Sequence, residues 1–172
     1  MQAPRIETPR TLLRAPSQAD FEPFSVMWAD PEVTRFIGGK PFSRNENWTR
    51  FLRMSGLWAI LGYGYWSIED KAGRYIGTVG FADFMRGIPE IERIPEAGWA
   101  LVPDTHGQGL ASEVVGAIVG WADAQLGAPQ TCCIIDPGHD ASFRVAEKNG
   151  FVVEGLVDYD DGQTTVFKRA RR

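Results

Sequence analysis

Residues 105–113 read THGQGLASE, a glycine-rich turn that passes from an apolar strand straight into a predicted helix. Glycine has no Cβ atom, so Gly107 and Gly109 let a ligand approach the backbone closely. The predicted helix begins near Gly109, and its first N–H groups lack partners within the helix and carry a partial positive charge. Turns of this kind bind phosphate groups, so we expect a phosphorylated ligand here.

The turn by itself fits more than one role. Gly107-x-Gly109 matches the start of a dinucleotide-binding fingerprint, but Ser112 occupies the position of the third glycine. The sequence contains no run of glycine, four residues and Gly-Lys-Ser/Thr, which a P-loop requires. An ordinary strand-to-helix connection, whose glycines serve only chain reversal, stays open as a structural alternative.

The segments on either side of the turn decide between these readings. PEAGWALVP precedes it at residues 95–103, and SFRVAEKNGF follows at residues 142–151, after a long predicted helix and a strand. In this order the segments resemble the GNAT superfamily of acyl-CoA-dependent N-acetyltransferases. TPRTLLR at residues 8–14 and the EKNGF ending are similar to its ribosomal-protein N-acetyltransferase branch (RimJ/RimL-like).

Hydrophobic periodicity predicts a domain of mixed α/β (α+β) class, and the resemblance implies the GNAT fold for it. That fold has a mixed, mostly antiparallel central sheet of six to seven strands, splayed at the acyl-CoA site and flanked by about four helices. Strands are expected at residues 11–14, 65–69, 75–81, 96–102, 131–135, 151–153 and 164–167. Helices are expected to begin near Asp20, at a Ser43 cap, after Gly109 and at Asp140 or Ser142. We find no linker, and we expect one domain over residues 1–172.

Composition and charge narrow the classes of function. The chain has 18 basic and 22 acidic residues, a net charge of −4, so a general nucleic-acid-binding surface is not expected. We interpret the basic residues at 168–172 as a solvated tail. No apolar run approaches the roughly 20 residues that span a bilayer, and the first residues lack the core of a signal peptide. We therefore expect a cytoplasmic protein with no membrane partner.

Metal chemistry is not expected either. Cys132 and Cys133 are neighbours in a predicted strand, so their side chains point to opposite faces, and we interpret both as packing residues. The two histidines, His106 and His139, have no ligand spacing typical of zinc.

The resemblance implies acetyl-CoA as cosubstrate, lying like an extra strand where the central strand and the next one splay apart. It implies that the backbone around Leu101 and Val102 binds the pantetheine arm. The pyrophosphate would be surrounded by the residues of the turn, which are Gly107, Gln108, Gly109, Leu110 and Ala111. The family pattern here is Arg or Gln, two residues, Gly, one residue, Gly or Ala; this chain has His106 in the first position. We count His106 among the cofactor-binding residues despite this departure.

A second departure precedes the last helix. The branch has an asparagine three residues before the serine that is Ser142 here, and this chain has His139 at that position. The asparagine helps to hold the pantetheine arm, and an imidazole can also donate or accept a hydrogen bond. We therefore expect His139 to contact the cosubstrate, with an ordinary loop residue as the alternative.

Acyl transfer from a thioester to an amine needs a neutral amine and a proton for the departing thiolate. Glu96, at the start of the central strand, is our candidate base, and a surface glutamate at a strand end is the alternative. Many GNAT enzymes protonate the thiolate with a tyrosine, but this chain has Ala146 at that position. The resemblance assigns the role to Ser142, which is also expected to contact the cosubstrate.

These residues predict an acetyl-CoA-dependent N-acetyltransferase that acts by direct attack of a primary amine in a ternary complex. The acceptor is a protein N-terminus or a small-molecule amine, and the loop at residues 85–93 is expected to border its site. The resemblance also implies a homodimer. Because His106, His139 and Ala146 depart from the family pattern, a catalytically degenerate acyl-CoA-binding sensor stays open as the alternative.

Overall fold

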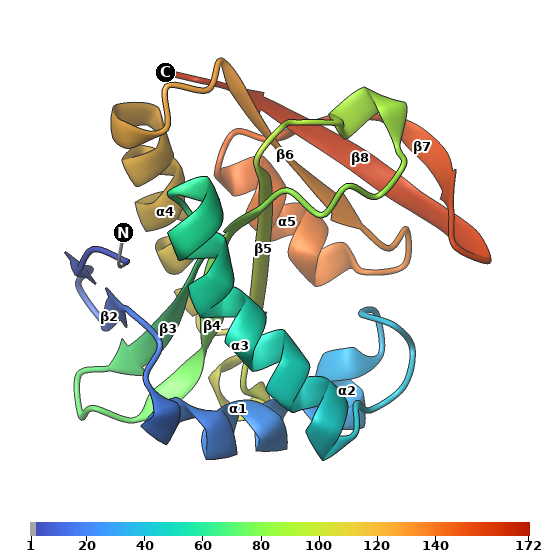
Figure 1. The fold of residues 1–172 in the computed structure, drawn as a ribbon. Helices are drawn as coiled ribbons and strands as arrows, with labels where there is room; N and C mark the ends of the chain where they lie inside the picture. The colour runs from blue at the N-terminus through green and yellow to red at the C-terminus, as the bar shows by residue number, and fades with distance from the viewer. Residues whose placement is uncertain (1–2) are drawn as a thin grey trace.

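The computed structural model describes residues 3–172, which form one twisted sheet with helices on both faces (Figure 1). The strands are β1 (Ile6–Glu7), β2 (Thr11–Arg14), β3 (Tyr65–Asp70), β4 (Tyr75–Ala82), β5 (Glu96–Leu101), β6 (Gln130–Ile135), β7 (Val152–Tyr159) and β8 (Gly162–Ala170). The helices are α1 (Phe21–Trp28), α2 (Pro31–Thr34), α3 (Arg44–Leu61), α4 (Leu110–Gln125) and α5 (Asp140–Lys148). The strand order is β1-β2-β3-β4-β5-β6-β8-β7.

The predicted mixed, mostly antiparallel sheet is confirmed. Within residues 3–172 only β5 and β6 pair in parallel, and the other neighbours are antiparallel. The described chain has eight strands rather than six to seven, because β1 has only two residues and carries no periodic signal. It has five α-helices rather than about four, because α2 is a single turn after Pro31.

The helix boundaries follow from local capping chemistry. The Ser43 side chain accepts a hydrogen bond from the Glu46 N–H, and the Glu46 carboxylate accepts one from the Ser43 N–H at 2.7 Å. This capping box starts α3 where the sequence predicts it. Gly62 ends α3 with a φ of 76°, a conformation that glycine adopts without strain.

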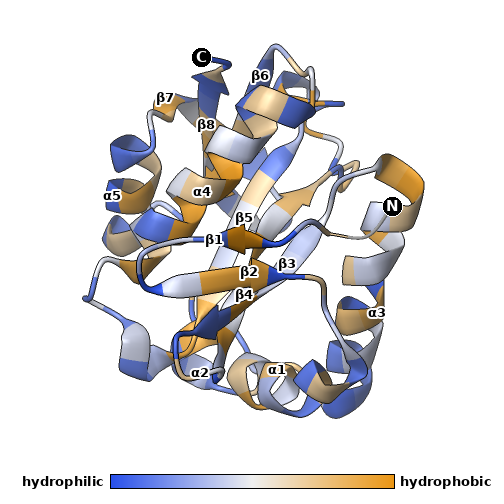
Figure 2. Ribbon diagram, turned by 90° about the vertical axis from the view of Figure 1, so that its left-hand side faces the viewer, coloured by the Kyte–Doolittle hydropathy of each residue, from blue (hydrophilic) through white to orange (hydrophobic). Residues whose placement is uncertain are grey.

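The core has a part on each face of the sheet. Val114 and Ile118 of α4 pack with Leu101 on one face, whereas Phe24 of α1 and Phe51 of α3 belong to the cluster on the other. Figure 2 shows the apolar residues concentrated on the strands and on the helix faces turned toward them. The cysteines are buried in separate clusters, Cys133 under α4 and Cys132 beside Ile88, Ile91 and Val166. Their interpretation as packing residues is confirmed.

The sheet opens between its two parallel strands. The register of β5 against β6 consists of one pair, Glu96 opposite Cys132, although each strand has six residues. The strands therefore diverge toward the carboxyl end of β5. This divergence is the predicted splay, and it gives a ligand access to the backbone of β5.

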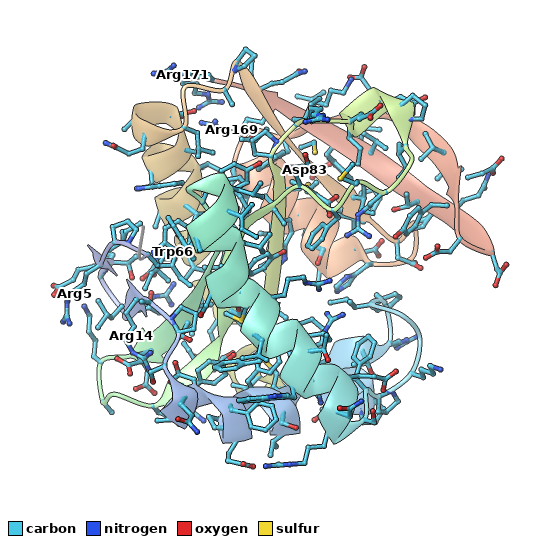
Figure 3. All side chains as sticks on the ribbon, in the orientation of Figure 1. Arg5, Arg14, Trp66, Asp83, Arg169 and Arg171 are labelled. Atoms are coloured by element: carbon cyan, nitrogen blue, oxygen red, sulfur yellow. The ribbon has the colours of Figure 1, made fainter. Side chains whose placement is uncertain are left out.

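The basic C-terminus is not a solvated tail as a whole. Strand β8 continues to Ala170, and the Arg169 side chain is only 5% exposed. Its guanidinium donates two hydrogen bonds to the Asp123 carboxylate of α4, at 2.8 and 2.6 Å. Figure 3 labels Arg169 and Arg171 beside the end of α4. Our interpretation was wrong for Arg169, because a long-range partner on α4 decides its burial.

A buried carboxylate ties the start of α1 to the sheet. Asp20 accepts hydrogen bonds from Arg14 at 2.7 and 2.6 Å, from the Ser17 N–H at 2.8 Å and from the Ser67 hydroxyl at 2.9 Å. Burial acts to raise the pKa of Asp20, but the hydrogen bonds from Arg14, Ser17 and Ser67 outweigh it and hold that pKa below its usual value. Asp20 is therefore charged at neutral pH.

We expect Asp20→Asn to lower the free energy of unfolding by about 1–3 kcal/mol, because an amide cannot accept all these hydrogen bonds. The folded-state pKa lies below the unfolded one, so the wild-type advantage is present above the unfolded pKa and disappears as pH falls through the folded pKa. Urea unfolding at several pH values measures both effects. Asp104→Asn, at an exposed ion pair, should cost less than about 1 kcal/mol. Equal losses in the two variants would contradict the prediction.

Candidate active site

A cavity of about 600 Å³ lies where the sheet opens. One wall comes from α1, from α3 and from the segment that follows α2, and the other comes from β5, β6 and the β7–β8 hairpin. Among the residues predicted from the sequence, Glu96, His139 and Ser142 line it. The two candidate catalytic residues, Glu96 and Ser142, thus share one cavity although 46 positions separate them in the sequence. The cavity also receives Trp99 from β5.

Ser142 lies in the first turn of α5 and is buried. Its Oγ is 3.5 Å from Nε2 of His139, at the outer limit of a hydrogen bond. The His139 ring stacks on Phe36, with ring centroids 4.3 Å apart and an interplanar angle of 13°. Burial lowers the pKa of His139 below its usual 6.5, so the imidazole is neutral at pH 7. The pair therefore presents a hydroxyl and a neutral ring nitrogen to the cavity.

Glu96 is held by an arginine from the loop that precedes β5. Arg86 donates to both carboxylate oxygens, from Nε at 2.7 Å and from Nη2 at 2.8 Å, and it donates from Nη1 to the Tyr159 hydroxyl at 2.6 Å. Glu96 is 6% exposed, which contradicts the alternative of a surface glutamate. Each of its oxygens keeps an acceptor position beside the arginine. Its role as a base stays a prediction.

Tyr65 of β3 reaches the same place. A Cβ atom added at Gly98 would lie 2.2 Å from the Tyr65 hydroxyl oxygen, so this side chain fits only because position 98 is glycine. Burial raises the pKa of Tyr65 well above its usual value, so the hydroxyl keeps its proton. A neutral hydroxyl thus lies against the centre of β5.

The glycine turn forms a separate, exposed surface at the start of α4. Gly107 and Gly109 have φ angles of 72° and 77°, which favour glycine. A Cβ at Gly107 would meet no described atom within 4 Å. Arg10 donates from Nη1 to the Gln108 carbonyl at 2.7 Å and from Nε to Glu113 at 2.6 Å. Open backbone, a helix N-terminus and a nearby guanidinium suit a diphosphate.

At the end of β5, neighbouring backbone N–H groups point to different sides, one toward β4 and the next toward the gap beside β6. Val102 donates its N–H to the Ile76 carbonyl at 3.0 Å, and its carbonyl accepts from the Thr105 N–H at 3.1 Å and from the Thr105 hydroxyl at 2.7 Å. Both backbone groups of Val102 thus have partners among residues 3–172, and its contact with a pantetheine arm stays a prediction. Neighbouring residues of a strand point their N–H groups to opposite sides, so that of Leu101 faces the gap toward β6.

His106 turns back toward β5. Its Nε2–H donates to the Leu101 carbonyl at 2.9 Å, and its Nδ1 lies 3.6 Å from a carboxylate oxygen of Glu32. The ring thus bridges the turn and the segment of α2. Within the described chain, the cavity lining includes none of the turn residues 105–111, so the glycine turn and the cavity lie at different places along the opening.

Sequence reasoning did not single out most of the lining residues; among the polar ones that it missed are Arg50, Tyr65, Arg86 and Tyr159. They come from a helix, a strand, a loop and a hairpin, and none belongs to a recognisable motif. One signal was the composition of the loop at residues 85–93, which was expected to border the acceptor site and contributes Arg86 to the cavity.

In residues 3–172 no group of three or more His, Cys, Asp or Glu side chains is placed to hold a metal ion. Over the same residues, none of the helices combines the length and the apolar character that crossing a bilayer requires.

The chain is similar to known proteins over nearly its whole length. The profile of the Acetyltransferase (GNAT) domain family matches residues 10–152. The uncharacterized N-acetyltransferase YoaA of Bacillus subtilis (strain 168) is 28% identical over 156 residues, which cover 90% of this chain and 86% of YoaA. A structure described as a GNAT-family acetyltransferase from Bordetella pertussis superposes with a TM-score of 0.86 at 26% identity, covering 98% of this chain and 100% of that one.

A solved structure with lower sequence identity has the same fold. Spermidine N-acetyltransferase from Vibrio cholerae, in complex with CoA and spermine, superposes with a TM-score of 0.76 at 16% identity, covering 95% of this chain and 97% of that one. At this identity the likeness shows the fold alone.

Proposed function

Because the chain belongs to the GNAT acetyltransferase family and is an acyltransferase, we propose that it transfers an acetyl group from acetyl-CoA to a primary amine. The observation that carries the proposal is the opening of the sheet between β5 and β6. It brings Ser142 and Glu96 to one cavity, and the glycine turn lies beyond the carboxyl end of the same strand. The Vibrio cholerae structure of the same fold contains CoA, which supports the choice of cosubstrate.

The residues present fit acetyl-CoA. The turn at Gly107 and Gly109 offers open backbone and the N-terminus of α4 for the diphosphate, and Arg10 adds a guanidinium. The Leu101 N–H, which faces the gap toward β6, would pair with the pantetheine arm. His139 and Ser142, at the start of α5 after β6, line the cavity, where the thioester would lie.

Two cavity residues would act on the two reacting groups, the departing thiolate and the attacking amine. Ser142 would donate a hydrogen bond to the departing thiolate, because position 146 is a buried alanine and offers no hydroxyl. The proton that the amine loses as the C–N bond forms would pass to Glu96 or to water and then to the thiolate as the C–S bond breaks. Glu96, fixed by Arg86, would accept a hydrogen bond from the acceptor amine and hold it near the thioester. Direct attack then needs no covalent bond to the enzyme.

The proposal is tested by calorimetric titration with acetyl-CoA, followed on the same sample by release of free thiol with a panel of amines and N-terminal peptides. We expect binding at one site per chain and thiol release with at least one amine. Binding without release from any acceptor would favour the acyl-CoA sensor instead. Absence of binding would contradict the assignment of the glycine turn.

A further inference from the structure

The cavity contains an arginine that has no anionic partner. Arg50 of α3 lines the cavity, and its guanidinium carbon lies 4.3 Å from the ring centroids of both Trp28 and Phe42. Its Nε is buried and has no hydrogen-bond partner among residues 3–172. The aromatic rings hold the guanidinium in place, but they leave donors of this side chain unused.

Its neighbours in the cavity add to the positive charge. Arg35 and Arg53 also line the cavity, and the described ion pairs include no carboxylate partner for either of them or for Arg50. Burial, together with the charges of Arg53 and Arg86, lowers the pKa of Arg50 to about 10. Arg50 is still protonated at pH 7, and a half-buried cation whose buried Nε has no hydrogen-bond partner among residues 3–172 is unfavourable.

The carboxylates of the cavity do not meet this demand. Glu96 is bound through both oxygens to Arg86. Asp136 and Asp160 line the cavity, but both are exposed, and Asp136 accepts a hydrogen bond from the Gly138 N–H at 2.8 Å. The end of the cavity next to α3 therefore presents Arg50, half-buried, and Arg53, exposed, neither of which forms an ion pair with a carboxylate of residues 3–172. Glu46, one turn before Arg50 on α3, favours the charged form of Arg50 from a distance but makes no ion pair with it.

The phosphates of the cosubstrate do not account for these arginines. The glycine turn, where a diphosphate fits, contributes no residue to the described cavity lining and has its own guanidinium from Arg10. Arg50 instead lies on α3, across the cavity from Ser142 of α5. These unpaired arginines therefore lie on the side of the cavity where the acceptor amine would bind.

We propose that the acceptor is a small amine that also carries an anionic group, a carboxylate or a phosphate, and that Arg50 and Arg53 bind this group. The inference rests on the proposed function and narrows its substrate class. A guanidinium binds a carboxylate or a phosphate through paired N–H donors, and the two aromatic rings orient it in advance. The same arginines disfavour a polycation such as spermine, because like charges repel in a cavity of low polarity.

The first test compares matched acceptors on the wild-type protein by thiol release from acetyl-CoA. The panel contains free amino acids with their methyl esters and amides, O-phosphoethanolamine with ethanolamine, and spermine. We expect the anionic members to have kcat/KM values roughly 10- to 100-fold above those of their neutral counterparts, as a charged hydrogen bond implies. The carboxylate and phosphate pairs show which anion the site takes.

The second test compares variants of α3. Arg50→Gln and Arg53→Gln should raise KM for the anionic acceptor about 10-fold or more while changing little for its neutral counterpart. Arg50→Lys, which keeps the charge, should restore part of the preference. Arg44→Gln is the matched control, because Arg44 lies on the same helix outside the cavity and pairs with Glu22. The acetyl-CoA Kd of all variants should match that of the wild type.

The outcomes separate this inference from the proposed function. Thiol release with spermine or with neutral amines at rates equal to those with anionic amines would overturn the inference and leave the transferase in place. Release with no amine at all would overturn the proposed function and the inference with it. If Arg50 serves packing only, Arg50→Gln lowers activity equally with acid and ester, which also overturns the inference. If Arg50→Gln does not fold, the wild-type panel and Arg53→Gln decide the question.

Discussion

Arg86→Ala is expected to lower the free energy of unfolding by about 3 kcal/mol, because it leaves the Glu96 carboxylate buried without its partner. Both oxygens of Glu96 accept hydrogen bonds from Arg86, and the Tyr159 hydroxyl accepts a third. The same variant should lower kcat/KM for the acceptor about 10- to 100-fold, since a misplaced positioning group has effects of this size. The acetyl-CoA Kd should hardly change, because Arg86 lies away from the glycine turn.

The control for this prediction is a second ion pair. Arg44→Ala removes an exposed partner of Glu22 and should cost less than about 1 kcal/mol. Arg86→Met combined with Glu96→Gln removes the buried charge altogether, and we expect it to recover most of the lost stability. Urea unfolding of Arg86→Met, of Glu96→Gln and of the double variant gives the coupling energy. If Arg86→Ala is as stable as Arg44→Ala, or if the double variant is the less stable one, the pair does not act as described.

Ser142→Ala is expected to lower kcat roughly 10- to 1000-fold with a smaller change in KM for either substrate, because the hydroxyl acts on the departing thiolate. The reaction should not stop, since a thiol with a reference pKa of about 8.5 can leave without a proton donor. Steady-state thiol release and acetyl-CoA titration measure the two quantities.

Two further serine variants serve as controls for Ser142→Ala. Ser55→Ala changes an exposed serine of α3 that does not line the cavity, and it should have the kinetics of the wild type. Ser142→Thr keeps the hydroxyl and should retain more activity than Ser142→Ala, provided that the added methyl group fits. A kcat of Ser142→Ala equal to that of the wild type would remove Ser142 from the mechanism and leave the tetrahedral intermediate to other donors.

The sequence did not predict which hydrogen-bond partners the residues around the cavity have. Glu96 was predicted as a base from its place at the start of the central strand, and the sequence did not predict that Arg86 would bind both of its carboxylate oxygens. Val102 was expected to bind pantetheine, and its N–H donates to the edge of β4. In both cases the residue is where the sequence places it, and the partner comes from another segment of the chain.

The sequence by itself determined the order of the elements, the start of α3 at Ser43, the glycine turn before α4 and the family. Capping, left-handed glycine and hydrophobic periodicity are properties of a few neighbouring residues, so they can be read along the chain. Only the tertiary structure decided that Arg86 pairs with Glu96, that Arg169 pairs with Asp123 and that the Arg50 Nε has no hydrogen-bond partner among residues 3–172. These facts depend on contacts between distant segments, and a side chain's charge and burial are set by the partners that folding brings to it.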